Sequence, residues 1–174
     1  IMVKQFALIG GPCTGKTTTL KALEKEGYQV VPEMARELIE EQQLIGGDLL
    51  PWKNFELFQI EIMNRRLLFE SKLNDRADIF FDTGLPTALA YYEMYGFKVP
   101  EKILKAVKEI KYDKVFLLSF LDFYELDGVR LEDKASALKT HEIIKRVYTR
   151  LGHDIITVPP CNVKERVKFI KKHI

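Results

Sequence analysis

A run of residues near the start of the chain has the spacing G-x-x-x-x-G-K-[ST]. Its members are Gly10, Gly11, Pro12, Cys13, Thr14, Gly15, Lys16 and Thr17. The glycines permit a turn so tight that successive backbone N–H groups point inward, where they can hold phosphate oxygens in front of a helix N-terminus. Lys16 adds a mobile positive charge near the β and γ phosphates, and the Thr17 hydroxyl is a ligand for Mg²⁺. This run, with Thr18 beside it, predicts a nucleoside triphosphate, which we take to be ATP, and Mg²⁺.

The segments around this run have the order that a phosphate-binding loop needs. Residues 4–9 form a short apolar run typical of a buried strand, and residues 18–25 have the pattern of an amphipathic helix with Leu20 and Leu23 on one side. A glycine turn that contains a lysine by chance would not explain this order. We therefore expect a strand, a phosphate loop and a helix in succession.

The composition limits the size of the fold and the kind of partner. A chain of 174 residues is long enough for one domain with a real core, so we expect residues 1–174 to form a single domain. The net charge of +2 gives no electrostatic reason to expect nucleic-acid binding, which needs a clustered basic face. No apolar stretch of membrane-spanning length or signal peptide is present, and Cys13 and Cys161 resemble no disulfide or zinc framework. These features favour a cytoplasmic monomer or homodimer that binds small molecules.

The rest of the chain alternates between strand and helix patterns. Strands are expected at residues 28–31, 78–82, 114–119 and 154–158. Helices are expected at residues 33–44, 52–73, 87–95, about 100–110, about 135–151, and in a final segment marked by Val163, Val167, Ile170 and Ile174. A charged segment at about 122–134 contains Asp127-Gly128 and is typical of an exposed loop. This alternation predicts an α/β fold with a parallel sheet, helices on both faces and a ligand site at the carboxyl ends of the strands.

Two acidic residues follow expected strands and so belong at that edge of the sheet. Asp82 is the natural Mg²⁺ partner, because the metal is held between the loop threonine and an acid at the end of a neighbouring strand. Asp82 is also a candidate N-cap for the segment that begins at Gly84, and the two roles are compatible. Glu33 could accept a proton from a substrate hydroxyl or bind a ribose, or it could be an acid favourably placed at a helix N-terminus.

Two arginines are candidates for contacts with phosphate. Arg36 lies three positions after Glu33, so it could hold a phosphate or pair with Glu33. Arg130 lies in the charged loop, and an arginine that arrives with a closing loop can stabilise the transition state of phosphoryl transfer.

Other chemically capable residues have simpler interpretations as well. Trp52, Phe55 and Gln59 open the long expected helix and could line an acceptor pocket, although bulky residues at helical spacing more often belong to a core. Cys13 occupies a variable position of the loop and is interpreted as a tolerated small residue. His141, His153 and His173 have no metal-ligand spacing and are interpreted as structural or surface residues.

The chain resembles a known family over nearly its whole length. The resemblance rests on residues 10–17, 31–37, 81–86, 127–130 and 158–159, of which only the first is specific alone. They are similar to the P-loop ATPase/kinase domains related to the ribosylnicotinamide kinase domain of the NAD-biosynthesis regulator, which are also described as AAA-type domains. More distantly, the layout resembles the nucleoside and nucleoside-monophosphate kinases.

The resemblance implies a three-layer sandwich with strand order 2-3-1-4-5, a lid at about 122–134 and adenine beside the loop after strand five, where Pro160 and Cys161 lie. It also implies that Glu33 is the acid near the acceptor hydroxyl, Asp82 the strand-three acid and Arg130 a lid arginine. The chain departs from the family at one point. Many relatives have Asp-Arg where this chain has Asp82-Thr83, and Arg36 or Arg130 could substitute for the missing arginine.

Two functions fit these observations. The first is a Mg²⁺-dependent kinase that transfers the γ-phosphoryl of ATP to a hydroxyl of a nucleoside-like or related metabolite. The second is a nucleotide-dependent binding module or ATPase with a protein partner. A GTPase is disfavoured because its [NT]-K-x-D motif is absent, and an AAA+ motor is disfavoured because Thr83 replaces the water-activating Glu.

Overall fold

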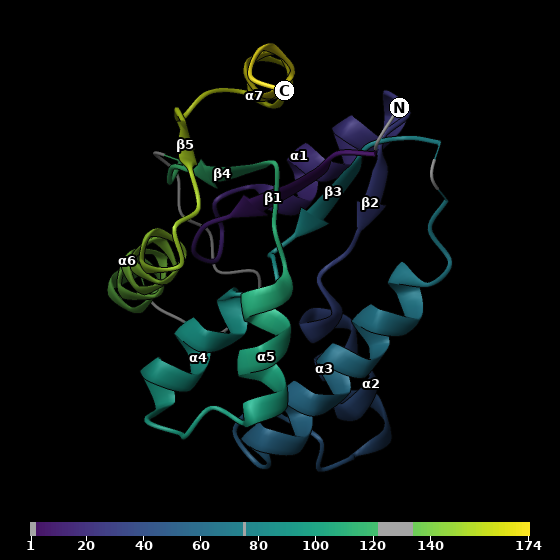
Figure 1. Cartoon of the computed structure of the whole chain (residues 1–174). Helices are drawn as coiled ribbons and strands as arrows, with labels where there is room; N and C mark the ends of the chain where they lie inside the picture. Colours follow the sequence, from purple (N-terminus) through teal and green to yellow (C-terminus); the bar gives the residue numbers. More distant parts are fainter. Residues whose placement is uncertain (1–2, 75, 122–133) are drawn as a thin grey trace.

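The computed structural model of this chain describes residues 3–74, 76–121 and 134–174. The strands are β1 (Gln5–Ile9), β2 (Gln29–Val31), β3 (Ile79–Asp82), β4 (Lys114–Leu118) and β5 (Ile155–Val158). The helices are α1 (Lys16–Lys25), α2 (Met34–Ile45), α3 (Phe55–Glu70), α4 (Thr87–Tyr95), α5 (Glu101–Glu109), α6 (Lys134–Arg150) and α7 (Val163–Lys172). The strands are parallel and have the order β2-β3-β1-β4-β5, which confirms the order implied by the resemblance (Figure 1).

Helices cover both faces of the sheet, because alternate residues of each strand point to opposite faces. On one face, Phe6 and Leu8 pack with residues of α1 and α7, and the ring of Phe6 lies 4.9 Å from that of Phe80. On the other face, Ala7 and Ile9 belong to a larger apolar cluster that includes residues of α3, α4, α5 and α6. Figure 1 shows α7 and α1 on one side of the sheet and the remaining helices on the other. The predicted three-layer arrangement is therefore correct.

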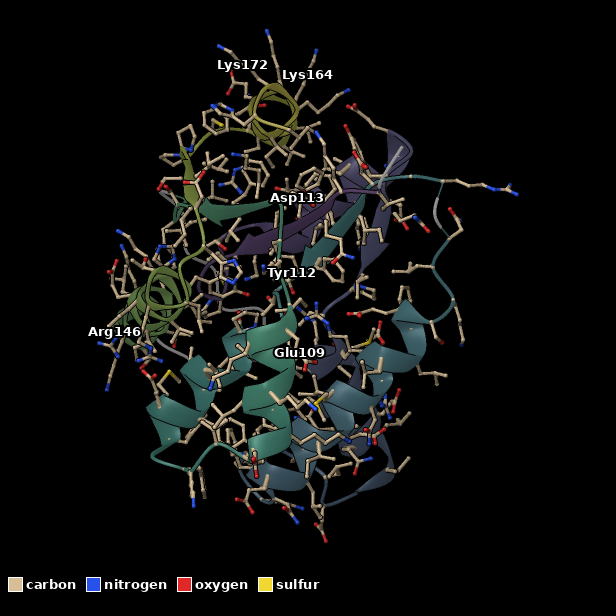
Figure 2. The ribbon with its side chains drawn as sticks, in the orientation of Figure 1. Glu109, Tyr112, Asp113, Arg146, Lys164 and Lys172 are labelled. Carbon is tan, nitrogen blue, oxygen red and sulfur yellow. The ribbon has the colours of Figure 1, made fainter. Side chains whose placement is uncertain are left out.

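The lysines of α7 lie on its outer side. Figure 2 shows Lys164 and Lys172 pointing away from the sheet, and Val167 and Ile170 of the same helix are buried. Among the described residues, no helix combines the length and the apolar character that crossing a membrane requires.

The long helix expected at 52–73 is shorter than predicted. Helix α3 begins at Phe55 because the Asn54 side chain accepts a hydrogen bond from the backbone N–H of Leu57, which is the geometry of an N-cap. The helix ends at Glu70, and Ser71 follows it as the C-cap. Trp52 therefore precedes the helix. The other elements agree with the predicted ranges to within one or two residues.

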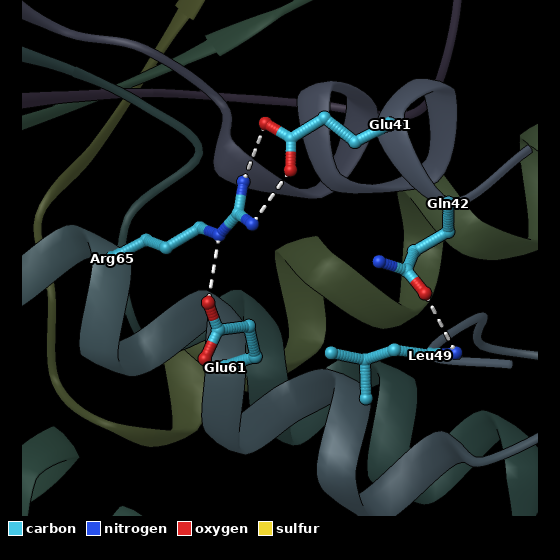
Figure 3. A network of polar contacts seen from close by, with 5 residues as sticks. All are labelled: Glu41, Gln42, Leu49, Glu61 and Arg65. Carbon is cyan, nitrogen blue, oxygen red and sulfur yellow. Dashed lines mark hydrogen bonds and ion pairs between the residues drawn. The ribbon is translucent and has the colours of Figure 1, made fainter. Parts of the chain in front are cut away.

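Polar contacts hold α2 against α3 (Figure 3). The guanidinium of Arg65 donates two hydrogen bonds to Glu41, at 2.9 and 2.7 Å, and a third to Glu61 at 2.9 Å. The hydrogen bond from Arg65 lowers the pKa of Glu41. In the last turn of α2, the Gln42 side chain accepts a hydrogen bond from the backbone N–H of Leu49, which lies beyond the helix. The Arg65 contacts hold α2, which follows β2, against α3, which precedes β3.

Candidate functional site

The predicted phosphate loop joins β1 to α1 and has an unusual backbone. Gly10 and Gly15 have φ angles of 142° and 80°, and Cys13 has a φ of 60°, in the left-handed region that residues with side chains rarely adopt. Gly15 is the N-cap of α1, so the loop leads directly into the positive end of a helix. The Thr14 hydroxyl donates a hydrogen bond to the Gly11 carbonyl and closes the turn. This local strain is typical of a loop that is shaped for a ligand.

Lys16 lies across this loop. Its side chain is mostly buried, at 7% exposure, and its Nζ atom donates hydrogen bonds of 3.0 Å to the carbonyl oxygens of both Gly10 and Gly11. The ammonium group is therefore held against the backbone of the loop, beside the carbonyl oxygens of Gly10 and Gly11.

Asp82 and Thr17 lie together, as predicted. The Thr17 hydroxyl donates a hydrogen bond of 3.1 Å to the Asp82 carboxylate, which is only 5% exposed. Asp82 ends β3 and is paired in register with Leu8 of β1, so the parallel sheet brings the carboxylate next to the phosphate loop. Asp82 is not the N-cap of the next helix, however, because α4 begins at Thr87 and is preceded by Pro86. That alternative prediction was wrong because Gly84, Leu85 and Pro86 turn the chain before the helix begins.

A buried arginine supports the turn after Asp82. Thr83 has a φ of 63°, and its carbonyl accepts a hydrogen bond of 3.1 Å from Arg66 of α3. The same guanidinium donates to Glu70 at 2.6 Å and to Tyr112 at 2.9 Å, and it lies over the ring of Phe81. Arg66 thus holds the backbone beside the candidate metal ligand.

A cavity of about 640 Å³ opens next to Asp82. The cavity is bounded by the start of α2, the segment before α3, α3 itself and the start of α4. Its wall includes Pro32, Glu33, Met34, Gln43, Trp52, Phe55, Phe58, Gln59, Arg66, Asp82, Thr83, Thr87, Tyr91 and Tyr95. The sequence suggested that Trp52, Phe55 and Gln59 could line a pocket, and all three do. Trp52 is 61% exposed at this wall, whereas Phe55 and Gln59 are buried.

Glu33 shares this cavity with Asp82. It is the N-cap residue of α2, although its side chain forms no capping hydrogen bond, so both readings of its position are compatible with the structure. Arg36, one turn further along α2, pairs with Glu40 at 3.1 Å and is not among the residues that line the cavity. Arg130 and the rest of the segment 122–133 lie outside the described residues.

The loop after β5 lies near the phosphate loop. Pro160 is exposed, and Cys161 is partly buried and acts electrostatically on the guanidinium of Arg166. Arg166 in turn donates a hydrogen bond to the carbonyl of Thr14. The predicted base-side segment and the phosphate loop are therefore neighbours.

Sequence reasoning missed two buried residues of the loop region. The ring nitrogen Nδ1 of His141 accepts a hydrogen bond of 3.1 Å from the backbone N–H of Gly11, and Arg166 binds the loop as just described. Nothing in the spacing of His141 indicates this contact, because it joins residues far apart in the sequence. Arg166 did give a signal, since it lies among Val163, Val167 and Ile170 on the apolar side of its helix.

A protein family described as "AAA domain" (AAA_28) matches residues 5–166. The chain belongs to this family. The match includes the phosphate loop, Asp82 and the loop after β5. A curated relative, the dephospho-CoA kinase of Helicobacter pylori (strain J99 / ATCC 700824), is 36% identical over 75 residues. That match covers 39% of this chain and 34% of the relative, so the chain aligns with about a third of the relative's length.

Solved structures share the fold of this AAA domain. A NadR protein in complex with NAD and AMP-PNP has a TM-score of 0.71 at 16% identity, over 98% of this chain and 49% of that one. The deoxyadenosine kinase from M. mycoides has a TM-score of 0.67 at 18% identity, over 97% of both chains. A thymidylate kinase from Ehrlichia chaffeensis has a TM-score of 0.64 at 14% identity, over 99% of both chains. The fold is therefore that of the P-loop kinases, as the resemblance implied.

Proposed function

We propose that this AAA domain is a Mg²⁺-dependent kinase that transfers the γ-phosphoryl of ATP to a hydroxyl of a nucleoside-like metabolite. The observation that carries the proposal is the position of Asp82. Its carboxylate contacts Thr17 of the phosphate loop and also forms part of the wall of the large cavity. A triphosphate in the loop and an acceptor in the cavity would meet at this residue.

The oxygen atoms of Thr17 and Asp82 fit Mg²⁺. This metal prefers oxygen ligands and is commonly bound by one or two protein groups, with phosphates and waters completing the shell. Among the described residues, no cluster of three or more His, Cys, Asp or Glu side chains could hold a metal by itself, which agrees with a metal that arrives with the nucleotide. Bound there, Mg²⁺ would neutralise charge on the β and γ phosphates.

Two side chains would bind the phosphoryl group and the acceptor. Lys16 would exchange its bonds to the loop carbonyls for the β and γ phosphates and so hold the phosphoryl group in position. Glu33 lies in the wall of the cavity, where it would orient the acceptor hydroxyl and accept its proton.

The charges of the cavity wall favour an acceptor without a phosphate of its own. Glu33 and Asp82 are acidic, and Arg66 is the cation among the described lining residues. The Arg66 guanidinium is already bound to Glu70, Thr83 and Tyr112. An anionic acceptor would therefore be repelled at this wall, whereas aromatic lining residues such as Phe55 and Tyr91 favour a flat heterocyclic ring.

The proposal is tested by measuring ADP formation from Mg-ATP with a panel of acceptors. The panel contains nucleosides, nucleoside monophosphates and dephospho-CoA, and the Lys16→Ala variant is the control for background turnover. We expect a nucleoside-like compound to raise ADP formation at least about tenfold above the acceptor-free rate, and Lys16→Ala to abolish the increase.

Two results would contradict it. ADP formation that is the same with and without every acceptor would favour an ATPase. Nucleotide binding without any turnover would favour a binding module with a protein partner.

A further inference from the structure

The phosphate loop is held by two buried side chains from distant parts of the chain. The backbone N–H of Gly11 donates to Nδ1 of His141 at 3.1 Å, and Nη1 of Arg166 donates to the carbonyl of Thr14 at 2.6 Å. His141 is 8% exposed and Arg166 is 1% exposed. They come from α6 and α7, so both C-terminal helices contact a loop near the N-terminus.

The loop backbone packs closely at these contacts, with no space for a side chain at Gly11 or Gly15. A Cβ atom on Gly11 would lie 2.7 Å from the carbonyl oxygen of Ala137 and 3.1 Å from the His141 side chain. A Cβ atom on Gly15 would lie 2.6 Å from Nη1 of Arg166. The glycine backbone thus packs directly against α6 and the Arg166 guanidinium.

We propose that His141 and Arg166 are positioning residues that fix the phosphate loop in its nucleotide-binding conformation, and that the His141 contact makes this conformation dependent on pH. The inference rests on the proposed function, because the ligand concerned is the nucleotide. Both residues act through the loop backbone, His141 through the Gly11 N–H and Arg166 through the Thr14 carbonyl.

The hydrogen bond to Gly11 requires a neutral imidazole. Nδ1 can accept from an N–H only when the ring proton is on Nε2, whereas a protonated ring carries donors on both nitrogens. Burial lowers the pKa of His141, Glu142 on the same helix raises it, and Lys16 and Lys145 lower it further. From the neighbouring α4, Glu93 is paired with Arg146 and Arg150, and the Phe120 ring that packs on the imidazole is uncharged.

Acidification would therefore break the His141 contact. Protonation would place a second donor opposite the Gly11 N–H and a positive charge near Lys16, and the loop would lose its support on that side. Arg166 keeps its charge throughout the accessible range of pH. The two supports are thus distinguishable, because only that of His141 titrates.

Arg166 is poorly explained as a stabilising residue. Its Nε and Nη2 atoms have no nitrogen or oxygen partner among the described residues, and burial lowers its pKa although the Cys161 side chain acts in the opposite direction. A buried cation with few partners costs stability. Replacing Arg166 by an apolar residue would therefore leave the denaturation temperature unchanged or raise it. A positioning role predicts instead that its removal weakens nucleotide binding.

The experiment compares His141→Asn, His141→Phe and Arg166→Met with the wild-type protein. Asn places an acceptor oxygen near the position of Nδ1 and does not titrate, whereas Phe keeps the ring and removes the acceptor. Binding of Mg-ADP is measured by calorimetry between about pH 5 and pH 8, a range that extends well below the ordinary pKa of histidine because burial lowers the pKa of His141. Circular dichroism at each pH checks that the variants are folded.

At pH 8 we expect His141→Asn to bind within about twofold of wild type and His141→Phe to bind about five- to tenfold more weakly, the effect of one net hydrogen bond. The ratio of wild-type to His141→Asn affinity should fall as the pH is lowered. Because both proteins bind the same nucleotide, this ratio cancels the effect of the nucleotide's own ionisation. Arg166→Met should bind more weakly at every pH, with an unchanged or higher denaturation temperature.

The inference is overturned if His141→Phe and Arg166→Met bind like wild type, or if wild type and His141→Asn have the same pH dependence. Should His141→Phe fail to fold, the comparison of wild type with His141→Asn still decides the pH dependence and Arg166→Met the positioning. A wild-type protein that binds no nucleotide would overturn the proposed function, and this inference with it.

Discussion

The carboxylate of Asp82 is nearly buried beside a threonine hydroxyl, and a buried negative charge is unfavourable unless it is compensated. A divalent cation at this position would interact with that charge and would lie between the phosphate loop and the cavity. The effect of Mg²⁺ on nucleotide affinity should therefore depend on the charge of this one side chain.

The Asp82→Asn variant removes the charge and keeps the shape. We expect the tightening of ATP binding by Mg²⁺ to fall by roughly tenfold or more, because a charge-assisted interaction is lost. Titration calorimetry with and without Mg²⁺ measures the effect, and the denaturation temperature without nucleotide is the control. Unchanged metal dependence would show that Asp82 does not bind the metal.

The sequence allows the roles of some single residues to be predicted, but not those of others. The roles of Lys16, Thr17 and Asp82 could be predicted because a local motif and a strand end determine their positions. Arg66 and Arg166 could have been singled out, since each is a charged residue on the apolar side of an amphipathic helix. The contact of His141 with Gly11 could not, because only the packed fold brings α6 to the loop.

The segment just before α3 forms part of the cavity wall and carries the one tryptophan of the chain. Trp52 was expected inside the helix but precedes it, because Asn54 is the N-cap. This displacement leaves the indole exposed at the wall instead of packed in the core. Helix ends depend on capping contacts that apolar periodicity does not reveal.

The position of Trp52 provides a direct signal of acceptor binding. An acceptor in the cavity should bury the indole and shift its fluorescence emission to shorter wavelength, whereas nucleotide alone should leave the emission nearly unchanged. The Trp52→Phe variant should lose the signal. An equal shift with nucleotide alone would place the nucleotide, and not the acceptor, against this wall.

The contact between α2 and α3 combines the Arg65 hydrogen bonds to Glu41 with the apolar packing of Leu38 and Ile39 against Phe58. The Arg65→Met variant keeps most of the side-chain length and removes the hydrogen bonds to Glu41 and Glu61. We expect a lower denaturation temperature and weaker acceptor binding at neutral pH, with little change in nucleotide binding, because these helices border the cavity and not the phosphate loop.

The same variant gives a pH dependence with a defined sign. The pKa of Glu41 is lowered from 4.5 in the folded protein, so its pair with Arg65 contributes stability above that pH and loses it as the pH falls through the lowered value. The difference in denaturation temperature between wild type and Arg65→Met should therefore shrink between pH 7 and about pH 3. A difference that stays constant over this range would show that the pair does not stabilise the fold.

For the whole molecule, the alternation of strands and helices determined most of the architecture. Right-handed crossovers restrict how parallel strands can be ordered, and the resemblance supplied the order 2-3-1-4-5 that the structure has. The site at the carboxyl edge of the sheet followed from the same rule. The size of the cavity and its aromatic wall did not follow, because they arise from side chains of separate helices that meet only in the packed fold.

The central claim is that the γ-phosphoryl group passes from the nucleotide to an acceptor in the cavity. The most direct test supplies wild-type protein with Mg-ATP labelled in the γ-phosphoryl group, together with the acceptor that most increases ADP formation, and separates the products by chromatography. We expect the label to appear on the acceptor, in an amount equal to the ADP formed, and we expect Lys16→Ala to prevent this transfer. Label that appears only as inorganic phosphate, at a rate independent of the acceptor, would contradict it.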